Sequence, residues 1–456
     1  MFQEDGSSSV TSTPVQALPM TSPSPGPISP YPWLKDLKPE ERGLYLIHLL
    51  ITCASHVSSG GLDLANMVLD QMSQLASPAG DTMQRIASYF SEALADRALR
   101  AWPGLYKAFR STNETPFSEK FLAWKMFSEF LPFLKAAFVI GNQAIVEAME
   151  GEKMVHVVDL NATEPAQWCS LIRDLSARPE GPPHLRITGI HPNKEVLEKM
   201  ANVLTHEAEK LDLPFQFNPV VTSLESLDVE NLRVKTGEAL AVSSVLQLHS
   251  LLAANNNNDF SNKYPLLGVH LQRTFEELNR RSPSNDSSFS SPPSSSSKPS
   301  STLDSFLSAL RGLSPKIMVV AEQDSEHNGR SLMERMSESL YFYAALFDCL
   351  ESTLPRASLE RLKMEKSLFG EEIKNIIACE GSERRERHEK LEKWGRRLDS
   401  AGFGNVPLSY YAMLQGKRLV QGFKCEGYRI KEESGCVVIC WYDRPLYSVS
   451  AWRFRR

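Results

Sequence analysis

The sequence predicts an α/β fold: a largely parallel β-sheet with antiparallel strands at its C-terminal end and an N-terminal helical cap. Three observations support this prediction. Apolar residues recur only at helical spacing up to about residue 150, short apolar runs alternate with helical stretches after it, and strand-like runs joined by turns end the chain. We therefore expect one capped domain at residues 39–456, with the cap at 39–150 and the core at 151–456.

The predicted cap consists of four or five helices. Its apolar side chains recur three and four residues apart, which is the spacing of one buried helix face. Prolines at positions 78, 103 and 132 interrupt the pattern and mark helix breaks. The clearest stretches are Leu44–Ala54, Leu62–Leu69 and Ile86–Ala98.

The predicted core alternates strands with helices, which is typical of a parallel sheet covered on both faces. We expect helices at 164–178, 192–211 and 326–352. The expected strands between them are Val155–Asp159, Leu185–Ile190, Phe215–Phe217, Ala239–Ser243 and Lys316–Glu322. Three further runs are separated by turns and predict antiparallel strands that close one side of the sheet: Phe423–Ile430, Cys436–Trp441 and Leu446–Phe454.

Two segments have the composition of disordered chain, because they lack the apolar side chains needed to offset the entropy of ordering. The first is a Ser/Pro-rich tail at residues 1–38, whose first 32 residues include 17 Ser, Thr or Pro. The second, at 282–302, has 12 Ser and 4 Pro in 21 positions. It lies between structured stretches, so we expect a long exposed loop within the domain.

Charge and cysteine content limit the class of protein. Fifty Lys and Arg against 55 Asp and Glu give a net charge of −5, which argues against non-specific coating of nucleic acid. Seven scattered cysteines are typical of a reducing compartment. The N-terminus has no signal-peptide pattern, and the most apolar helical run is too short to span a bilayer. We expect an intracellular protein with no membrane partner.

The alternation of strands and helices is Rossmann-like and raises the hypothesis of a nucleotide or adenosylmethionine cofactor. Such sites need a glycine-rich turn after the first strand and an acid after the second. Here the turn is Leu160–Pro165, without glycine, and His191 occupies the acidic position. Both requirements fail, so we expect no cofactor. A strand order by itself does not establish a function, and an adenosylmethionine-dependent enzyme stays open as an alternative.

Other chemical motifs are weak. No Cys-x-x-Cys pair is present, and Cys436 and Cys440 would be about 13 Å apart on a strand, at ~3.3 Å per residue. Asp159 and Glu322–Asp324 lie at strand ends, where catalytic acids can lie. No nucleophile or metal pattern accompanies them, so we interpret them as acids that cap the following helices or tie loops. The charged segment Glu383–Arg397 has acids and bases three and four residues apart, which predicts a solvated, salt-bridged helix. We expect no catalytic residues and no metal site.

Two Leu-x-x-Leu-Leu runs, Leu46–Leu50 and Leu248–Leu252, place three leucines on one helix face. Such a face can dock into a partner's groove, or it can be the buried face of an ordinary helix. We take Leu46, Leu49 and Leu50 of the first run as candidate partner-binding residues. Trp452 and Arg453, near the C-terminus, are two further candidates.

Six motifs, in order along the chain, resemble those of the plant GRAS family of regulators. The resemblance extends from about residue 39 to the end. The motifs are Val155–Asp159 with Gln167 and Trp168; Pro182–Ile190; Ser244–His249; Ser314–Gln323 with His327–Gly329; Asn375–Gly381 with Glu386–Glu389, Lys393 and Trp394; and Trp441–Leu446 with Ser450–Arg453. His191 and Ala162–Glu164 depart from the family pattern, which further weakens an enzymatic interpretation.

The resemblance implies a helical cap on a methyltransferase-like core, and a nuclear transcriptional co-regulator without enzyme activity. It implies partners of two kinds: indeterminate-domain zinc-finger transcription factors, and DELLA and other GRAS proteins, with homo- or heterodimers among the possibilities. It also implies a role in gibberellin signalling and root development. The acidic balance fits a regulator whose DNA contact comes mainly from a partner's basic fingers, and direct DNA binding stays open as an alternative.

Overall fold

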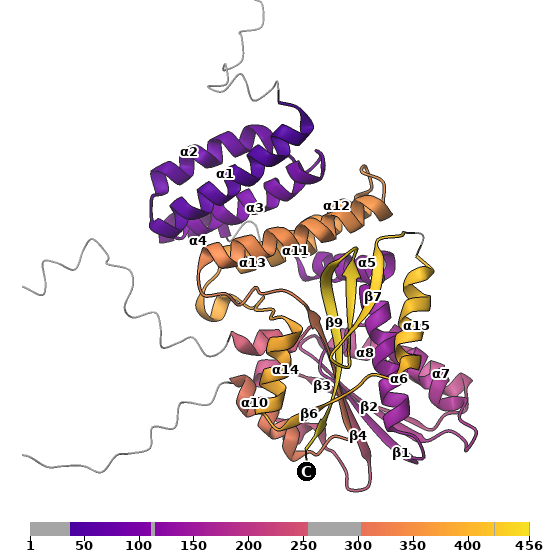
Figure 1. The fold of residues 1–456 in the computed structure, drawn as a ribbon. Helices are drawn as coiled ribbons and strands as arrows, with labels where there is room; N and C mark the ends of the chain where they lie inside the picture. Colours follow the sequence, from indigo (N-terminus) through magenta and orange to yellow (C-terminus); the bar gives the residue numbers. More distant parts are fainter. Residues whose placement is uncertain (1–36, 111–114, 254–301, 424, 456) are drawn as a thin grey trace, which may run out of the picture.

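The structure is a computed structural model, and it describes residues 37–110, 115–253, 302–423 and 425–455. Almost all of the predicted tail and of the Ser-rich segment at 282–302 lies outside the described residues. Within them the predicted fold is confirmed: a mixed sheet, mostly parallel, lies beneath a set of helices (Figure 1).

The sheet runs in the order β3-β2-β1-β4-β5-β9-β8-β7, and β6 pairs with one end of β9. The first five strands are parallel and the last three of this order are antiparallel. The chain moves outward in one direction from β1 to β3 and then returns to the other side with β4. The strands are β1 Met154–Asp159, β2 His184–His191, β3 Phe215–Val221, β4 Ala239–Val245, β5 Ile317–Gln323, β6 Phe403–Val406, β7 Tyr428–Glu433, β8 Cys436–Trp441 and β9 Arg444–Phe454.

Alternate residues of the central strands enter two separate cores, because successive side chains of a strand point to opposite faces. Val157 belongs to the core that includes residues of α6, α7 and α8, whereas Val158 belongs to the core that includes residues of α10 and α14. Both faces are therefore covered, and Figure 1 shows these helices on opposite sides of the sheet. The covering helices are α6 Phe133–Ala148, α7 Pro165–Ser176, α8 Lys194–Lys210, α10 Thr302–Gly312, α14 Leu391–Ser400 and α15 Tyr410–Gln421.

The helices above the sheet come from two distant parts of the chain. Figure 1 shows the N-terminal helices beside a layer formed by α11 to α13, which lie between β5 and β6 in the sequence. Tyr89 and Phe90 of α3 pack against Phe347 and Tyr343 of α11. The N-terminal helices are α1 Pro39–Ser59, α2 Leu62–Leu75, α3 Thr82–Leu99, α4 Pro103–Arg110 and α5 Phe117–Phe130, and the inserted helices are α11 Leu332–Thr353, α12 Leu359–Met364 and α13 Glu371–Ala378.

A π-helical turn, Glu365–Gly370, joins α12 to α13 and brings a buried acid toward the N-terminal helices. Glu365 contacts Arg85 of α3 at 3.1 Å and Arg361 of α12 at 3.0 Å, and all three side chains are buried. Gly370 passes so close to Tyr89 that a β-carbon would lie 2.9 Å from its ring. The π turn is thus part of the contact between the two groups of helices.

Several helix ends follow directly from local sequence. The side chains of Asp81 and Ser331 accept a hydrogen bond from the backbone N–H of the third residue of α3 and of α11. The side chains of those third residues, Gln84 and Glu334, accept one from the backbone N–H of Asp81 and Ser331, so each helix begins with a capping box. Gly60 ends α1 with a φ of 79°, a left-handed conformation that glycine adopts without strain.

Three local predictions differ from the structure. The predicted cap has six helices in place of four or five. Strand β6, Phe403–Val406, is not among the predicted strands; it follows the left-handed turn at Gly402. The strand predicted at Phe423–Ile430 begins at Tyr428. The unpredicted elements are short and carry little periodic signal, and the ends of a strand are harder to predict than its existence.

Candidate functional site

A cavity of about 440 Å³ lies at the carboxyl ends of the parallel strands, near the β1–β4 boundary where the strand order reverses. Ligand sites of open α/β sheets characteristically occur at this position. We call it the carboxyl-end cavity. It is lined by residues after the strands, by α5, by the start of α13 and by the segment before α14: Phe117, Lys120, Phe121, Trp124, Asn161, Thr163, His191, Leu246, His249, Gln323, Ser367, Leu368, Glu371, Glu372, Asn375, Arg385, Glu386 and His388.

Glu322, near the end of β5, organises one wall of this cavity. Its side chain is 1% exposed, and one carboxylate oxygen accepts hydrogen bonds from the backbone N–H groups of Gln247 and Leu248. The other oxygen lies 2.8 Å from Nδ1 of His249. The prediction that Glu322 ties a neighbouring loop therefore agrees with the structure. The loop is a short 3₁₀ helix, Leu248–Leu252.

His249 lies between two carboxylates. Its Nδ1 faces Glu322, and its Nε2 lies 3.4 Å from Glu386. Burial disfavours the imidazolium, but the two acids outweigh burial and raise the pKa of His249 to about 10. The imidazole of His249 is therefore mostly protonated at neutral pH.

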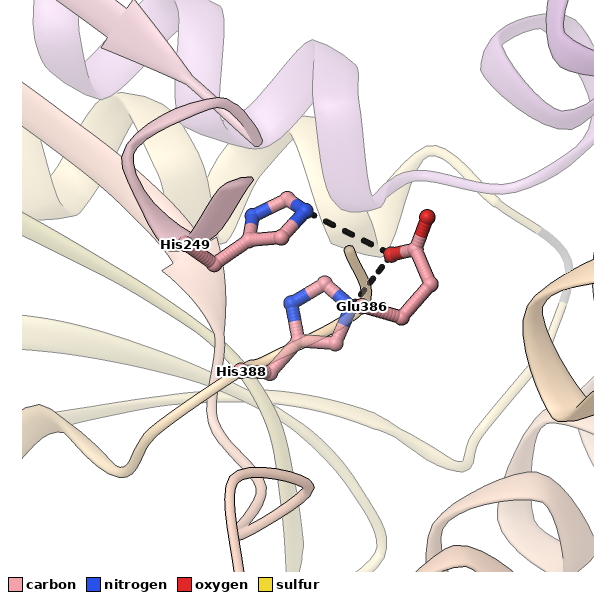
Figure 2. Close-up of side chains that lie close together, drawn as sticks. All are labelled: His249, Glu386 and His388. Carbon is pink, nitrogen blue, oxygen red and sulfur yellow. Dashed lines mark ion pairs between the residues drawn. The ribbon is translucent and has the colours of Figure 1, made fainter. Parts of the chain in front are cut away.

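Glu386 also contacts a second imidazole, His388, at 3.0 Å from Nε2 (Figure 2). The His249 and His388 rings are close, with centroids 4.0 Å apart. Burial raises the pKa of Glu386, but the two histidines outweigh it and hold this pKa well below its usual range. Burial, together with His249, lowers the pKa of His388.

A second buried acid, Glu372 of α13, faces the same cavity. Tyr343 donates a hydrogen bond of 2.8 Å to it, and Gln323 donates one of 3.4 Å. Burial and the nearby charge of Glu386 raise the pKa of Glu372 to about 8. At neutral pH Glu386 is thus ionised, whereas Glu372 is mostly protonated.

The turn after β1, where a cofactor turn was considered, is filled by its own side chains. Asn161 donates to the backbone carbonyl of Val245, and Thr163 donates to Asn161. Asp159 accepts hydrogen bonds from Trp168 and from the backbone of Asn161, so it ties the turn to α7, whereas Glu164 caps that helix. Ala162 packs so closely on Gly189 that a β-carbon there would lie 2.9 Å away.

The prediction of a solvated helix at Glu383–Arg397 is wrong for most of its length. Residues 384–390 are irregular, and α14 begins only at Leu391. Arg384 and Arg387 are each 3% exposed. Arg384 donates to the His327 carbonyl, and Arg387 donates to Asn328 and to the Gly381 carbonyl. These bonds pin the irregular segment and so position Glu386 and His388.

The predicted docking face of the first leucine run is corrected by the structure. Leu46, Leu49 and Leu50 are 0%, 4% and 0% exposed, because they form the inward face of α1. Trp452 is 4% exposed and donates to Ser450 within the sheet. Neither the three leucines nor Trp452 is exposed at the surface of this conformation. Arg453 is exposed, and its role in partner binding stays a prediction.

The acids and histidines of the cavity were missed as a group. Glu386 and His388 belong to a motif of the family resemblance and to the charged segment Glu383–Arg397, and neither pattern indicates a cluster with Glu322 or His249. The nearest signal was the Glu-x-His spacing at 386–388, but His249 is more than 130 residues away, so only the fold brings it there.

Within the described part of the chain, no single helix is long and apolar enough to cross a membrane. The consecutive helices α5 and α6 pass such a test only together, and they are bent by 72° at their junction. Most apolar side chains of α6 are buried in the core, which accounts for its composition.

Comparison with known proteins agrees with the fold and the motif order. The chain is 62% identical to Scarecrow-like protein 3 of Arabidopsis thaliana, over all of this chain and 99% of that protein. It is 49% identical to the GRAS family protein TF80 of Medicago truncatula, over 94% and 99% of the two chains. The solved structure of SCL7 from Oryza sativa is similar with a TM-score of 0.72 at 27% identity, over 90% of this chain and 99% of that one. A family model described as the GRAS domain family matches residues 46–453, and the chain therefore belongs to the GRAS family.

Proposed function

We propose that this protein is a nuclear transcriptional co-regulator that acts by binding other transcription factors, in gibberellin signalling and root development. Its partners would be indeterminate-domain zinc-finger proteins and DELLA or other GRAS proteins, and its DNA contact would be mainly indirect. The observation that carries the proposal is the GRAS match over nearly the whole domain, together with full-length similarity to Scarecrow-like protein 3. The net charge of −5 supports recruitment through a basic partner.

We propose a different surface for such a partner, because the leucine face of α1 is buried. Four apolar side chains of α1 and α2 are exposed: Leu44, Ile47, Leu64 and Met67 are 72%, 39%, 51% and 55% accessible. Each pair is spaced three residues apart along its helix, and α1 and α2 are neighbours (Figure 1). We call this set the α1–α2 apolar face. An apolar helix of another GRAS domain is the partner that this chemistry fits best.

The test compares a double substitution with a single control substitution in the full-length chain. Leu44→Asp with Ile47→Asp places charges on the α1–α2 apolar face without altering a buried side chain, so we expect capture of GRAS partners from plant nuclei to fall at least tenfold. Leu359→Asp, at a residue of α12 that is 67% exposed, is the matched control and should leave capture unchanged. Equal capture by both variants would argue against this surface.

Two further measurements address the alternatives. Calorimetry with adenosylmethionine tests the methyltransferase hypothesis, and we expect no micromolar binding. A shift assay with labelled promoter DNA and the purified chain, across salt concentrations, tests direct DNA binding, and we expect a shift only when a zinc-finger partner is added. If co-purification from plant nuclei found neither zinc-finger nor GRAS proteins, the proposed function itself would fail.

A further inference from the structure

We propose that His249, Glu386 and His388 bind a divalent transition-metal ion, with zinc the best match, and that its fourth coordination position opens into the carboxyl-end cavity. The three side chains converge from two separate segments of the chain (Figure 2). All three residues line the cavity. This inference is independent of the proposed partner binding.

The spacing of the ligand atoms fits a tetrahedral ion. Nε2 of His249 and Nε2 of His388 lie 3.4 and 3.0 Å from the same Glu386 carboxylate oxygen, and the three ligand atoms lie within 4.8 Å of one another. Ligands at about 2.0–2.1 Å from a tetrahedral zinc ion are separated by roughly 3.4 Å. The side chains therefore need only small rotations, and His249 the loss of its Nε2 proton, to hold an ion.

A supporting carboxylate already orients one ligand. Histidines that bind zinc usually direct their other nitrogen to a carboxylate, which fixes the ring and its tautomer. Glu322 holds this position, 2.8 Å from Nδ1 of His249, and is itself fixed by two backbone N–H groups. Nε2 of His249 is thereby directed toward the proposed ion.

His388 provides a second, independent observation. It is 1% exposed, and neither of its ring nitrogens has a hydrogen-bond partner of good geometry among the described residues. Buried polar groups rarely stay unsatisfied. A metal ion in contact with Nε2 would satisfy one of these two nitrogens and would replace the ion-pair contact with Glu386 by a shared coordination.

The donor set selects the kind of metal. Two imidazole nitrogens and one carboxylate favour zinc and its neighbours over Mg²⁺ or Ca²⁺, which prefer all-oxygen sites. Three protein ligands with the fourth position open are typical of zinc sites that hold a water molecule or a ligand oxygen. The cavity beside the cluster leaves room for that oxygen.

The test uses the full-length chain after dialysis against a chelator. Titration with Zn²⁺, followed by calorimetry and metal analysis, should show one equivalent bound with a dissociation constant below about 1 µM, and a raised melting temperature. Mg²⁺ should not compete. His388→Gln should weaken zinc binding more than 100-fold, and Glu322→Gln, which removes only the orienting carboxylate, by about 10–100-fold.

A matched control and a spectroscopic readout separate this site from the free cysteines. His206→Gln, at an exposed histidine of α8, should leave zinc affinity unchanged. Substitution by Co²⁺ should give the spectrum of nitrogen and oxygen ligands without a thiolate charge-transfer band. Absence of stoichiometric zinc binding, a thiolate band, or undiminished affinity in a folded His388→Gln variant would each overturn the proposal. If that variant does not fold, the cobalt spectrum of the unsubstituted chain decides.

Discussion

Individual buried polar and charged side chains, each with specific partners, distinguish this core from an ordinary apolar one. His156, for example, contacts Arg186 and Glu238 at one end of the sheet, and Glu322 binds His249 at the other. Removing one partner of such a buried group leaves the other unpaired at a large cost, whereas an exposed pair contributes little. Two predictions at this scale follow from particular residues.

The first concerns the pH dependence of stability at Asp159. Burial raises the pKa of this carboxyl from 3.8 to about 6, although Trp168 and Asn161 donate to it. The ionised form therefore destabilises the fold, fully above pH 6 and not at all below pH 3.8. Relative to Asp159→Asn, the free energy of unfolding of the unsubstituted chain should fall by about 3 kcal/mol between about pH 4 and about pH 7.

Urea unfolding of both chains at several pH values measures this difference. An Asp63→Asn variant, at an exposed carboxylate of α2, serves as the control and should run parallel to the unsubstituted chain. Parallel curves for Asp159→Asn as well would contradict the prediction.

The second concerns Arg85, which is fully buried and contacts Glu365 and Glu351 at 3.1 and 2.9 Å. Arg85→Met leaves Glu365 buried with only Arg361 beside it, so the free energy of unfolding should fall by about 3–5 kcal/mol. Arg396→Met removes an exposed i,i+4 pair with Glu392 and should cost less than about 1 kcal/mol. Chemical denaturation compares the two variants, and equal losses would refute the importance of burial.

At the scale of elements, close approach between strands and turns determines where glycine is required. A β-carbon at Gly189 of β2 would lie 2.7 Å from the Phe217 ring on β3 and 2.9 Å from Ala162 in the turn after β1. The absence of a β-carbon at Gly189 thus allows β2, β3 and the turn after β1 to lie this close together at the edge of the carboxyl-end cavity.

Gly189→Ala should therefore destabilise the protein by about 1–3 kcal/mol, because overpacking forces its neighbours to move. Gly104→Ala, in α4, is the matched control: no atom lies within 4 Å of the added carbon, and the helix should gain roughly 0.5–1 kcal/mol. Thermal denaturation measures both. A neutral Gly189→Ala would show that β2 and the turn can separate without cost.

At the scale of the whole molecule, the helices above the sheet form one packed unit with the core. The π turn, the ion cluster at Arg85 and the aromatic contacts between α3 and α11 link segments almost 300 residues apart. The predicted boundary of the cap at residue 150 is therefore not a boundary of packing, because α6 covers the sheet and α11–α13 lie with the N-terminal helices.

We expect unfolding in a single cooperative transition, with far-ultraviolet circular dichroism and tryptophan fluorescence giving the same midpoint. Deleting residues 37–100 should yield aggregated protein, since it uncovers Tyr343 and Phe347. Two separated transitions, or a soluble monomeric deletion variant, would show instead that the N-terminal helices are an independent domain.

The fold was largely predictable because its signals are local. The five parallel strands appear where short apolar runs alternate with helices, and capping residues such as Asp81 and Ser331 fix helix starts. Element β6 was missed because four residues give no periodicity. The segment at 384–390 was misassigned because its charge spacing suits a helix, although Arg384 and Arg387 bond to carbonyls of the interior.

The sequence alone determined the fold class, the order of elements and the GRAS motifs, since each depends on residues that are neighbours along the chain. Only the tertiary structure decided that Leu46, Leu49 and Leu50 are buried, because a leucine stripe looks the same whether it faces a core or a partner. It also decided the cluster of His249, Glu322, Glu386 and His388. Residues so far apart in the sequence come together because the parallel strands end at the same edge of the sheet. No local sequence pattern encodes this arrangement.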